Sequence, residues 1–186
     1  MFHNQERPRN VWIEQLSLAE RIGATGSPSL IPDDFELRSE ALGVCAVVMG
    51  EDGMVWNMRL LIDTPLGRKY GYSATACTEA PAKVAAVVSL IDRRLEAQEQ
   101  SGSRYLVGET LTAADIYWAT VSISILPPPP EIMPLTRQNK KALEYFAMNS
   151  KIPIVAEALS QRIENHQRYI LSTYCETPAV LGGDPL

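Results

Sequence analysis

The sequence predicts an all-α fold, a single helical bundle. Apolar residues recur at intervals of three and four residues in six segments, which is the spacing of one face of a helix. The sequence contains no series of alternating apolar and polar runs joined by Asn-Gly or Asp-Gly turns, so it predicts no strand. A length of 186 residues and an apolar content of 46% fit one globular domain with a buried core.

The first helix is predicted over residues 11–22. Trp12 and Leu16 lie four residues apart and therefore share one face, while charged residues occupy other positions. Asn10 can cap the start of this helix, and Gly23 supplies the left-handed stop that often ends one. A segment rich in glycine, serine and proline follows, which indicates a loop before the next helix.

The second helix is predicted over residues 33–63. Asp33 and Glu36 have the spacing of a capping box, in which each side chain accepts a hydrogen bond from the other residue's amide. The apolar spacing continues beyond Gly50 and Gly53 without a change of phase. We therefore expect one long helix, either straight or kinked at the two glycines, that ends near residue 63.

Four further helices follow after residue 78. They are predicted over residues 79–100, 113–126, 137–149 and 153–174. The segment 64–78 is expected to be a loop, and Pro127–Pro130 prevent any continuation of the preceding helix. The helix over 113–126 is apolar on nearly every side, which predicts that it lies at the centre of the bundle. His166 falls on the apolar face of the last helix and is interpreted as a core or interface residue.

Charge and hydropathy argue against several partners and locations. The chain has 17 basic and 22 acidic residues and a formal charge of −5, whereas a nucleic-acid or anionic-membrane surface favours basic residues. The longest apolar-rich stretch, residues 116–126, is too short to span a bilayer. The first ten residues are polar and show no secretory signal. We expect no nucleic-acid partner, no membrane insertion and a cytoplasmic location.

The cysteine and histidine residues do not suggest a metal site. Cys45, Cys77 and Cys175 form no C-x-x-C pair, and His3 and His166 are the two histidines in the chain. These residues predict neither a disulfide framework nor a zinc site. Cys77 lies before the predicted start of a helix, where a thiolate would be stabilised, so its reactivity is left open.

A complete helix start is encoded between residues 103 and 117. Thr112 and Asp115 have the spacing of a capping box, and Leu111 and Ile116 occupy the two positions of a hydrophobic staple. Gly108 permits the turn that leads into the cap. We interpret these residues as structural, since they satisfy helix-end amides wherever they occur, and assign no catalytic residue.

This segment resembles the signature of the C-terminal helical domain of the glutathione transferase family. The match is carried by residues 105–108 (YLVG) and 111–116 (LTAADI), which in that family start a buried core helix. The resemblance implies that 33–186 is the helical domain. It also implies that 1–32 is the last helix and linker of a thioredoxin-like domain whose remainder is missing. The family's glutathione site lies on that domain, so its fold carries over better than its chemistry.

The resemblance also nominates a pocket for a hydrophobic small molecule. In the family this pocket is lined by the helices that correspond here to 34–63 and to the start of the core helix. The residues implied are Met54, Trp56, Asn57, Arg59 and Tyr117. The competing interpretation places Met54 and Trp56 in the core and leaves Arg59 as a solvated charge.

Two classes of function remain open. The first is a non-catalytic module that binds a hydrophobic small molecule or forms a dimer, with no cofactor required. The second is a transferase that conjugates glutathione, as co-substrate, to a hydrophobic electrophile. That activity would need a thiol site from a missing N-terminal domain or from another chain. A homodimer is expected in either case, because the family's long helices form much of its dimer contact.

Overall fold

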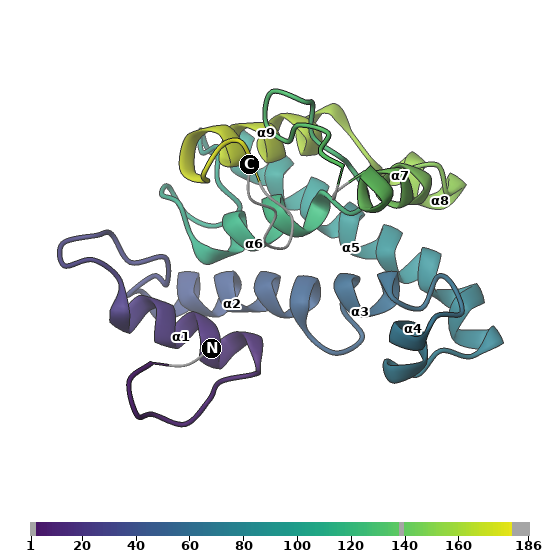
Figure 1. Ribbon diagram of the computed structural model, residues 1–186. Coiled ribbons are helices and arrows are strands. Elements are labelled where there is room, and N and C mark those ends of the chain that lie inside the picture. Colours follow the sequence, from purple (N-terminus) through teal and green to yellow (C-terminus); the bar gives the residue numbers. More distant parts are fainter. Residues whose placement is uncertain (1–2, 138–139, 180–186) are drawn as a thin grey trace.

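The computed structural model describes residues 3–137 and 140–179, and within them the fold is all-α, with no strand (Figure 1). In chain order the helices are α1 (Trp12–Ile22), α2 (Phe35–Met49), α3 (Met54–Met58), α4 (Pro65–Lys69), α5 (Ala74–Gln100), α6 (Ala113–Ser122), α7 (Lys140–Asn149), α8 (Pro153–Ala158) and α9 (Gln161–Tyr174). The all-α prediction is therefore confirmed.

Helix α6 forms the centre of the bundle, as its sequence predicts. It packs against α2 on one side and against α9 on the other (Figure 1). The Trp118 side chain of α6 is completely buried. The long helix α5 packs against α3, α8 and α9 and closes the main core, to which it contributes Val84, Val88, Ile91 and Leu95. The apolar face of each helix is thus buried against a neighbour, which is the main source of helix stability in a bundle.

The prediction of one continuous helix over 33–63 is wrong. Helix α2 ends at Met49, and α3 begins at Met54 after a break of four residues. Gly50 and Gly53 adopt extended backbone, and Asp52 has a positive φ of 58°. A side chain at Gly53 would place its Cβ 2.7 Å from the Val47 carbonyl oxygen, so the chain can turn this closely only with glycine there.

Several predicted helix boundaries also need correction. The N-cap of α2 is Asp34 rather than Asp33, and its carboxylate accepts from the Glu36 and Leu37 amides at 3.0 and 2.9 Å. Residues 64–78 contain α4 and the start of α5, because the side chains of Thr64 and Ser73 cap these helices. The predicted helix over 153–174 is divided into α8 and α9, since the Ser160 hydroxyl caps the second of them. Val11, not Asn10, stands at the N-cap of α1.

The length and hydropathy of helix α5 bear on the predicted absence of membrane insertion. Among the described residues it is long enough, and over one window of 18 residues apolar enough at a mean hydropathy of 1.3, to cross a membrane. This follows from length and composition alone, and the core helix of a soluble protein passes the same test. The expected cytoplasmic location therefore stays a prediction.

Candidate functional site

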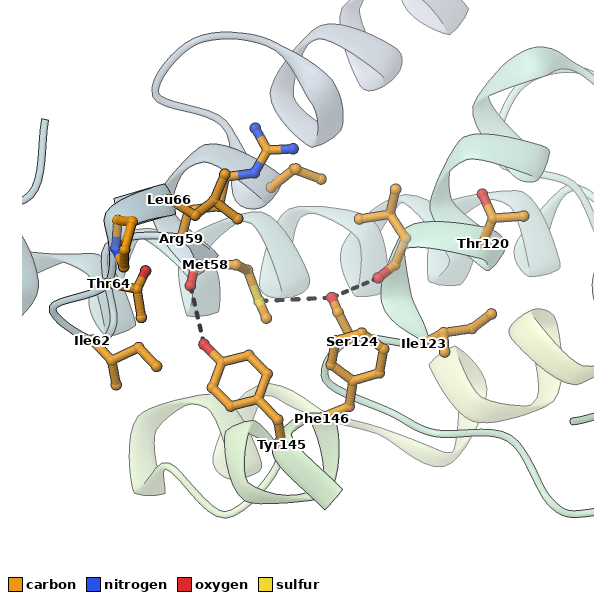
Figure 2. Close-up of a pocket in the computed structure, with 13 residues that line it drawn as sticks. Met58, Arg59, Ile62, Thr64, Leu66, Thr120, Ile123, Ser124, Tyr145 and Phe146 are labelled. Carbon is orange, nitrogen blue, oxygen red and sulfur yellow. Dashed lines mark hydrogen bonds between the residues drawn. The ribbon is translucent and has the colours of Figure 1, made fainter. Parts of the chain in front are cut away.

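An open cavity of about 690 Å³ lies between the α3–α4 region, the end of α6 and α7 (Figure 2). Most of its lining side chains are apolar: Val55, Met58, Ile62, Pro65, Leu66, Val121, Ile123 and Phe146. The remaining lining residues are Arg59, Thr64, Thr120, Ser124 and Tyr145. A volume of this size is within the range of about 300–1,000 Å³ that is typical of small-molecule sites.

Most polar side chains on the cavity wall form their hydrogen bonds within the protein. The hydroxyls of Ser124 and Thr120 donate to the carbonyls of Val121 and Ile116, both at 2.7 Å. The Tyr145 hydroxyl donates to the Met58 carbonyl at 3.5 Å (Figure 2). Burial raises the pKa of Tyr145, so its phenol stays neutral. The wall therefore offers an apolar surface with few free hydrogen-bonding groups.

The cavity exists because the chain makes two close turns after α2. The first is the break at residues 50–53, which separates α3 from α2. The second brings α4 against the segment that follows α3, where a Cβ on Gly67 would lie 2.7 Å from the Arg59 carbonyl and 2.9 Å from the Ile62 carbonyl. Thr64 fixes the start of α4 by accepting a hydrogen bond from the Gly67 amide at 2.9 Å. The α3–α4 wall is thus a stable part of the fold.

The opposite wall is held by buried amide side chains. The Asn149 side chain of α7 donates to the Ser124 carbonyl at 3.0 Å, which joins α7 to the chain that follows α6. The Gln167 amide of α9 donates to the Ser122 hydroxyl and to the Leu126 carbonyl, both at 2.9 Å. Since both amides are almost completely buried, losing either set of bonds would leave polar groups without partners. These bonds keep the end of α6 in place beside the cavity.

Arg59 is the charged residue of the cavity lining. Its guanidinium lies 4.1 Å from the centre of the Tyr70 ring, a cation–π contact that orients it. In Figure 2 the guanidinium lies at the edge of the group of lining side chains, on the side away from Tyr145 and Phe146. Among the described residues no carboxylate pairs with it, whereas Arg68 nearby in the sequence forms an ion pair with Asp63 at 2.7 Å.

The structure separates the five residues that the resemblance nominates. Arg59 lines the cavity, whereas Met54 is completely buried in the core. Asn57 is also buried, and its side-chain amide donates to the carbonyls of Asp52 and Gly53 at 2.7 and 2.9 Å. Both residues stabilise the turn and core beneath the cavity and do not face it.

The two nominated aromatic residues lie apart from the cavity lining. Trp56 packs edge-on against Tyr70, with ring centres 4.9 Å apart. Tyr117 packs edge-on against Trp12 at 6.1 Å and lines a separate apolar groove of about 420 Å³ between α1 and α6. Tyr145 and Phe146 of α7, which complete the cavity, are not among the five nominated residues. Their signal was the apolar spacing of that predicted helix, which indicated burial without indicating a partner.

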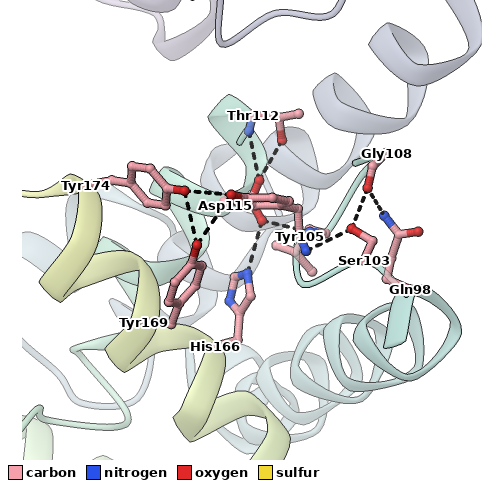
Figure 3. Close-up of polar contacts among 10 residues, drawn as sticks. Gln98, Ser103, Tyr105, Gly108, Thr112, Asp115, His166, Tyr169 and Tyr174 are labelled. Carbon is pink, nitrogen blue, oxygen red and sulfur yellow. Dashed lines mark hydrogen bonds and ion pairs between the residues drawn. The ribbon is translucent and has the colours of Figure 1, made fainter. Parts of the chain in front are cut away.

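The predicted cap of α6 is present and is more extensive than its motif (Figure 3). Thr112 is the N-cap, and its amide and hydroxyl both donate to one oxygen of Asp115, at 2.9 and 3.0 Å. The other oxygen accepts from the Leu106 amide at 2.7 Å and lies 3.0 Å from His166 Nε2. The capping carboxylate therefore also joins α6 to the preceding loop and to α9.

The two residues predicted to form the staple pack against one apolar cluster. Leu111 and Ile116 both lie against the second apolar cluster, which includes Ile170 and Leu171 of α9. They therefore bury the entrance of α6 against the last helix. The predicted role of His166 as a core residue agrees with its exposure of 6%.

The cysteines differ in their accessibility. Cys45 is completely buried, and burial raises the pKa of its thiol to about 12. Cys77 is half-buried in the first turn of α5, where its thiol donates to the Leu61 carbonyl at 3.3 Å. No group of three or more His, Cys, Asp or Glu side chains that could hold a metal ion occurs in the part of the chain that the structure describes.

Comparisons with protein-family models, with curated proteins and with solved structures found no match to this chain. The similarity of segment 103–117 to the glutathione transferase signature therefore remains a prediction. What the chain does must be inferred from the cavity itself.

Proposed function

We propose that this protein binds a hydrophobic small molecule in the cavity between the α3–α4 region, the end of α6 and α7. The observation that carries the proposal is an open volume of about 690 Å³ with a mostly apolar lining. Ligand sites of small molecules are concave, largely preformed and mostly apolar, with a few polar groups that set orientation. Transfer of an apolar ligand from water into such a site releases about 25 cal/mol for each Å² of surface that it buries.

The proposal keeps the predicted module class of function. A helical domain similar to that of the glutathione transferases would act here as a binding module that needs no cofactor. The alternative, conjugation of glutathione to a hydrophobic electrophile, would use the same cavity for the electrophile and a thiol site from elsewhere. Homodimer formation belongs to the same proposal and rests on the family resemblance alone.

The test uses phenylnaphthylamine, a neutral apolar dye that becomes fluorescent when it leaves water. We expect the full chain to bind it with saturable fluorescence. The variant Ser124→Phe places a ring in the middle of the lining and should weaken this binding by about tenfold or more, which is about 1.4 kcal/mol. Ser124 is suited to this because it lines the cavity and its hydroxyl lies 3.8 Å from the Met58 sulfur (Figure 2).

A matched control is available on α9. Ser172 is exposed, and its hydroxyl donates to the carbonyl three residues earlier, as that of Ser124 does. Ser172→Phe therefore makes the same chemical change away from the cavity and should leave dye binding unchanged. The proposal is refuted if the wild-type chain does not bind the dye, or if Ser124→Phe binds it as well as Ser172→Phe does while both remain helical by circular dichroism.

A further inference from the structure

We propose that the ligand of this cavity is an amphipathic anion, with an apolar body inside the cavity and its acidic group on Arg59. This inference rests on the proposed function and specifies the class of ligand. Among the described residues that line the cavity, Arg59 is the one that carries a full charge. The other polar lining residues are hydroxyl-bearing.

Two of the acidic side chains near Arg59 in the sequence, Asp63 and Asp52, are bound to other cations, and among the described residues the third, Glu51, forms no ion pair with Arg59. Asp63 accepts two hydrogen bonds from Arg68, at 2.7 and 3.0 Å. Asp52 pairs with Lys83 of α5 at 2.7 Å. The guanidinium of Arg59 therefore keeps its donors free of any carboxylate in the described chain, although the protein as a whole carries a formal charge of −5. A free cation at an apolar cavity in an acidic protein is a specific feature of this site.

The position of the guanidinium suits it for recognition of an acidic group. Its central carbon lies 4.1 Å from the centre of the Tyr70 ring, and a guanidinium that stacks on a ring through its face keeps the N–H groups at its edge available. Those N–H groups form a planar fork that can donate two parallel hydrogen bonds to a carboxylate, sulfonate or phosphate. The apolar walls formed by residues such as Met58, Ile123 and Phe146 would enclose the rest of the ligand.

The surroundings strengthen this interaction relative to an exposed surface pair. Arg59 is half-buried, and apolar side chains border it, so an ion pair there is less screened by water than one on an open surface. The stacking on Tyr70 also restricts the side chain before the ligand arrives, which lowers the entropy lost on binding. Both effects favour an anion over a neutral molecule of the same shape.

The experiment compares two dyes with the same ring system: neutral phenylnaphthylamine and its sulfonated form, anilinonaphthalene sulfonate. With the wild-type chain we expect tighter binding of the sulfonate, and added salt should weaken its binding alone. Arg59→Gln should weaken sulfonate binding by about tenfold and leave the neutral dye within about twofold. Arg59→Lys keeps the charge without the planar fork and should give an intermediate affinity.

Arg93→Gln is the matched control, because Arg93 is an exposed arginine of α5 and does not line the cavity. It should leave both affinities unchanged. Equal effects of Arg59→Gln on the two dyes, or no effect on the sulfonate, would overturn the inference and leave the proposed function standing. Failure of the wild-type chain to bind the neutral dye would instead refute the proposed function. If Arg59→Gln does not fold, the salt dependence of the wild-type chain and the Arg59→Lys variant still decide the matter.

Discussion

Replacement of Asp115 by asparagine tests the buried carboxylate that caps α6. The carboxylate is completely buried at the start of α6. One oxygen accepts from the amide and the hydroxyl of Thr112, while the other accepts from the Leu106 amide and lies 3.0 Å from His166 Nε2. Three donors and one histidine ring nitrogen therefore converge on a group that carries no donor of its own when ionised. Asparagine replaces one of the two oxygens with an NH₂ group, which cannot accept from the backbone amide on that side.

The expected loss follows from these four contacts. The Thr112 hydroxyl can rotate and accept from the new NH₂ group, but a backbone amide cannot. At least one buried amide or ring N–H is then left without a partner, which costs about 1–3 kcal/mol. The contacts that survive lose the charge on their acceptor, which weakens each of them further. We expect Asp115→Asn to lower the free energy of unfolding by about 3–5 kcal/mol. This is a large part of the roughly 5–15 kcal/mol that is typical of a domain.

Urea denaturation followed by circular dichroism measures this loss. With an m-value of about 2 kcal/mol/M, the midpoint should fall by about 2 M. Asp33→Asn is the control, because Asp33 is fully exposed and lies 3.6 Å from Arg38, and it should leave the midpoint unchanged. Thr112→Val removes the hydroxyl, with its contact to Asp115 and its part in the capping box, and should cost about 1 kcal/mol, which keeps the test usable if Asp115→Asn does not fold. A loss below about 1 kcal/mol for Asp115→Asn would refute the reasoning.

Three further predictions concern two glycine substitutions, the labelling of the cysteines and the pH dependence of stability. Gly53→Ala should cost about 1–3 kcal/mol, because its Cβ would overlap the Val47 carbonyl. Gly43 lies in α2 with open space around it, so Gly43→Ala should raise the free energy of unfolding by about 0.5–1 kcal/mol in the same urea assay. A lower free energy of unfolding for this variant would contradict the reasoning. At pH 8 a thiol reagent followed by mass spectrometry should label Cys77 well before Cys45, whose pKa burial raises to about 12. Because that folded-state pKa lies above the ordinary value of 9.0, the stability that the neutral Cys45 thiol contributes should be complete below pH 9 and decline as the pH rises toward 12. Equal labelling rates for Cys77 and Cys45 would contradict the predicted difference between the two thiols, and a stability that does not fall between pH 9 and pH 12 in the urea assay would contradict the pH dependence.

The cap of α6 could be predicted from sequence because a capping box is a local pattern. Thr112 and Asp115 lie three residues apart, and their geometry follows directly once a helix starts between them. The contact with His166 could not be predicted in this way, because 51 residues separate it from Asp115. Sequence analysis placed this histidine on a buried face, but only the packing of α9 on α6 shows which group it meets.

The break between α2 and α3 was missed for a geometric reason. The four residues between Met49 and Met54 are close to the 3.6 residues of one helical turn. A break of that length returns the apolar positions to the same side, so the periodicity continues as though the helix were unbroken. Val48 before the break and Met54 after it consequently lie in one core cluster. The two glycines were the correct signal, but the continuing phase outweighed them.

The cavity could be predicted only in part for a similar reason. Periodicity reports which side chains point away from water, but it does not distinguish a side chain that packs against another from one that lines an empty space. Met54 and Met58 lie one turn apart in α3 and both belong to the main core cluster, yet Met58 also lines the cavity and Met54 does not. Arg59 was nominated through the family resemblance, whereas the α7 residues Tyr145 and Phe146 needed the folded chain.

The cap and the cavity are connected through α6, because one helix carries both. Asp115 anchors its first turn to the preceding loop and to α9, while Val121 in its last turn lines the cavity. Helix α6 spans only Ala113–Ser122, about 15 Å at 1.5 Å per residue, so a rigid anchor at its start limits movement at its end. A ligand that binds the folded state alone stabilises it in proportion to the logarithm of ligand concentration. The buried carboxylate holds the start of α6, and a ligand in the cavity would contact the residues at its end, so both would stabilise the same folded state.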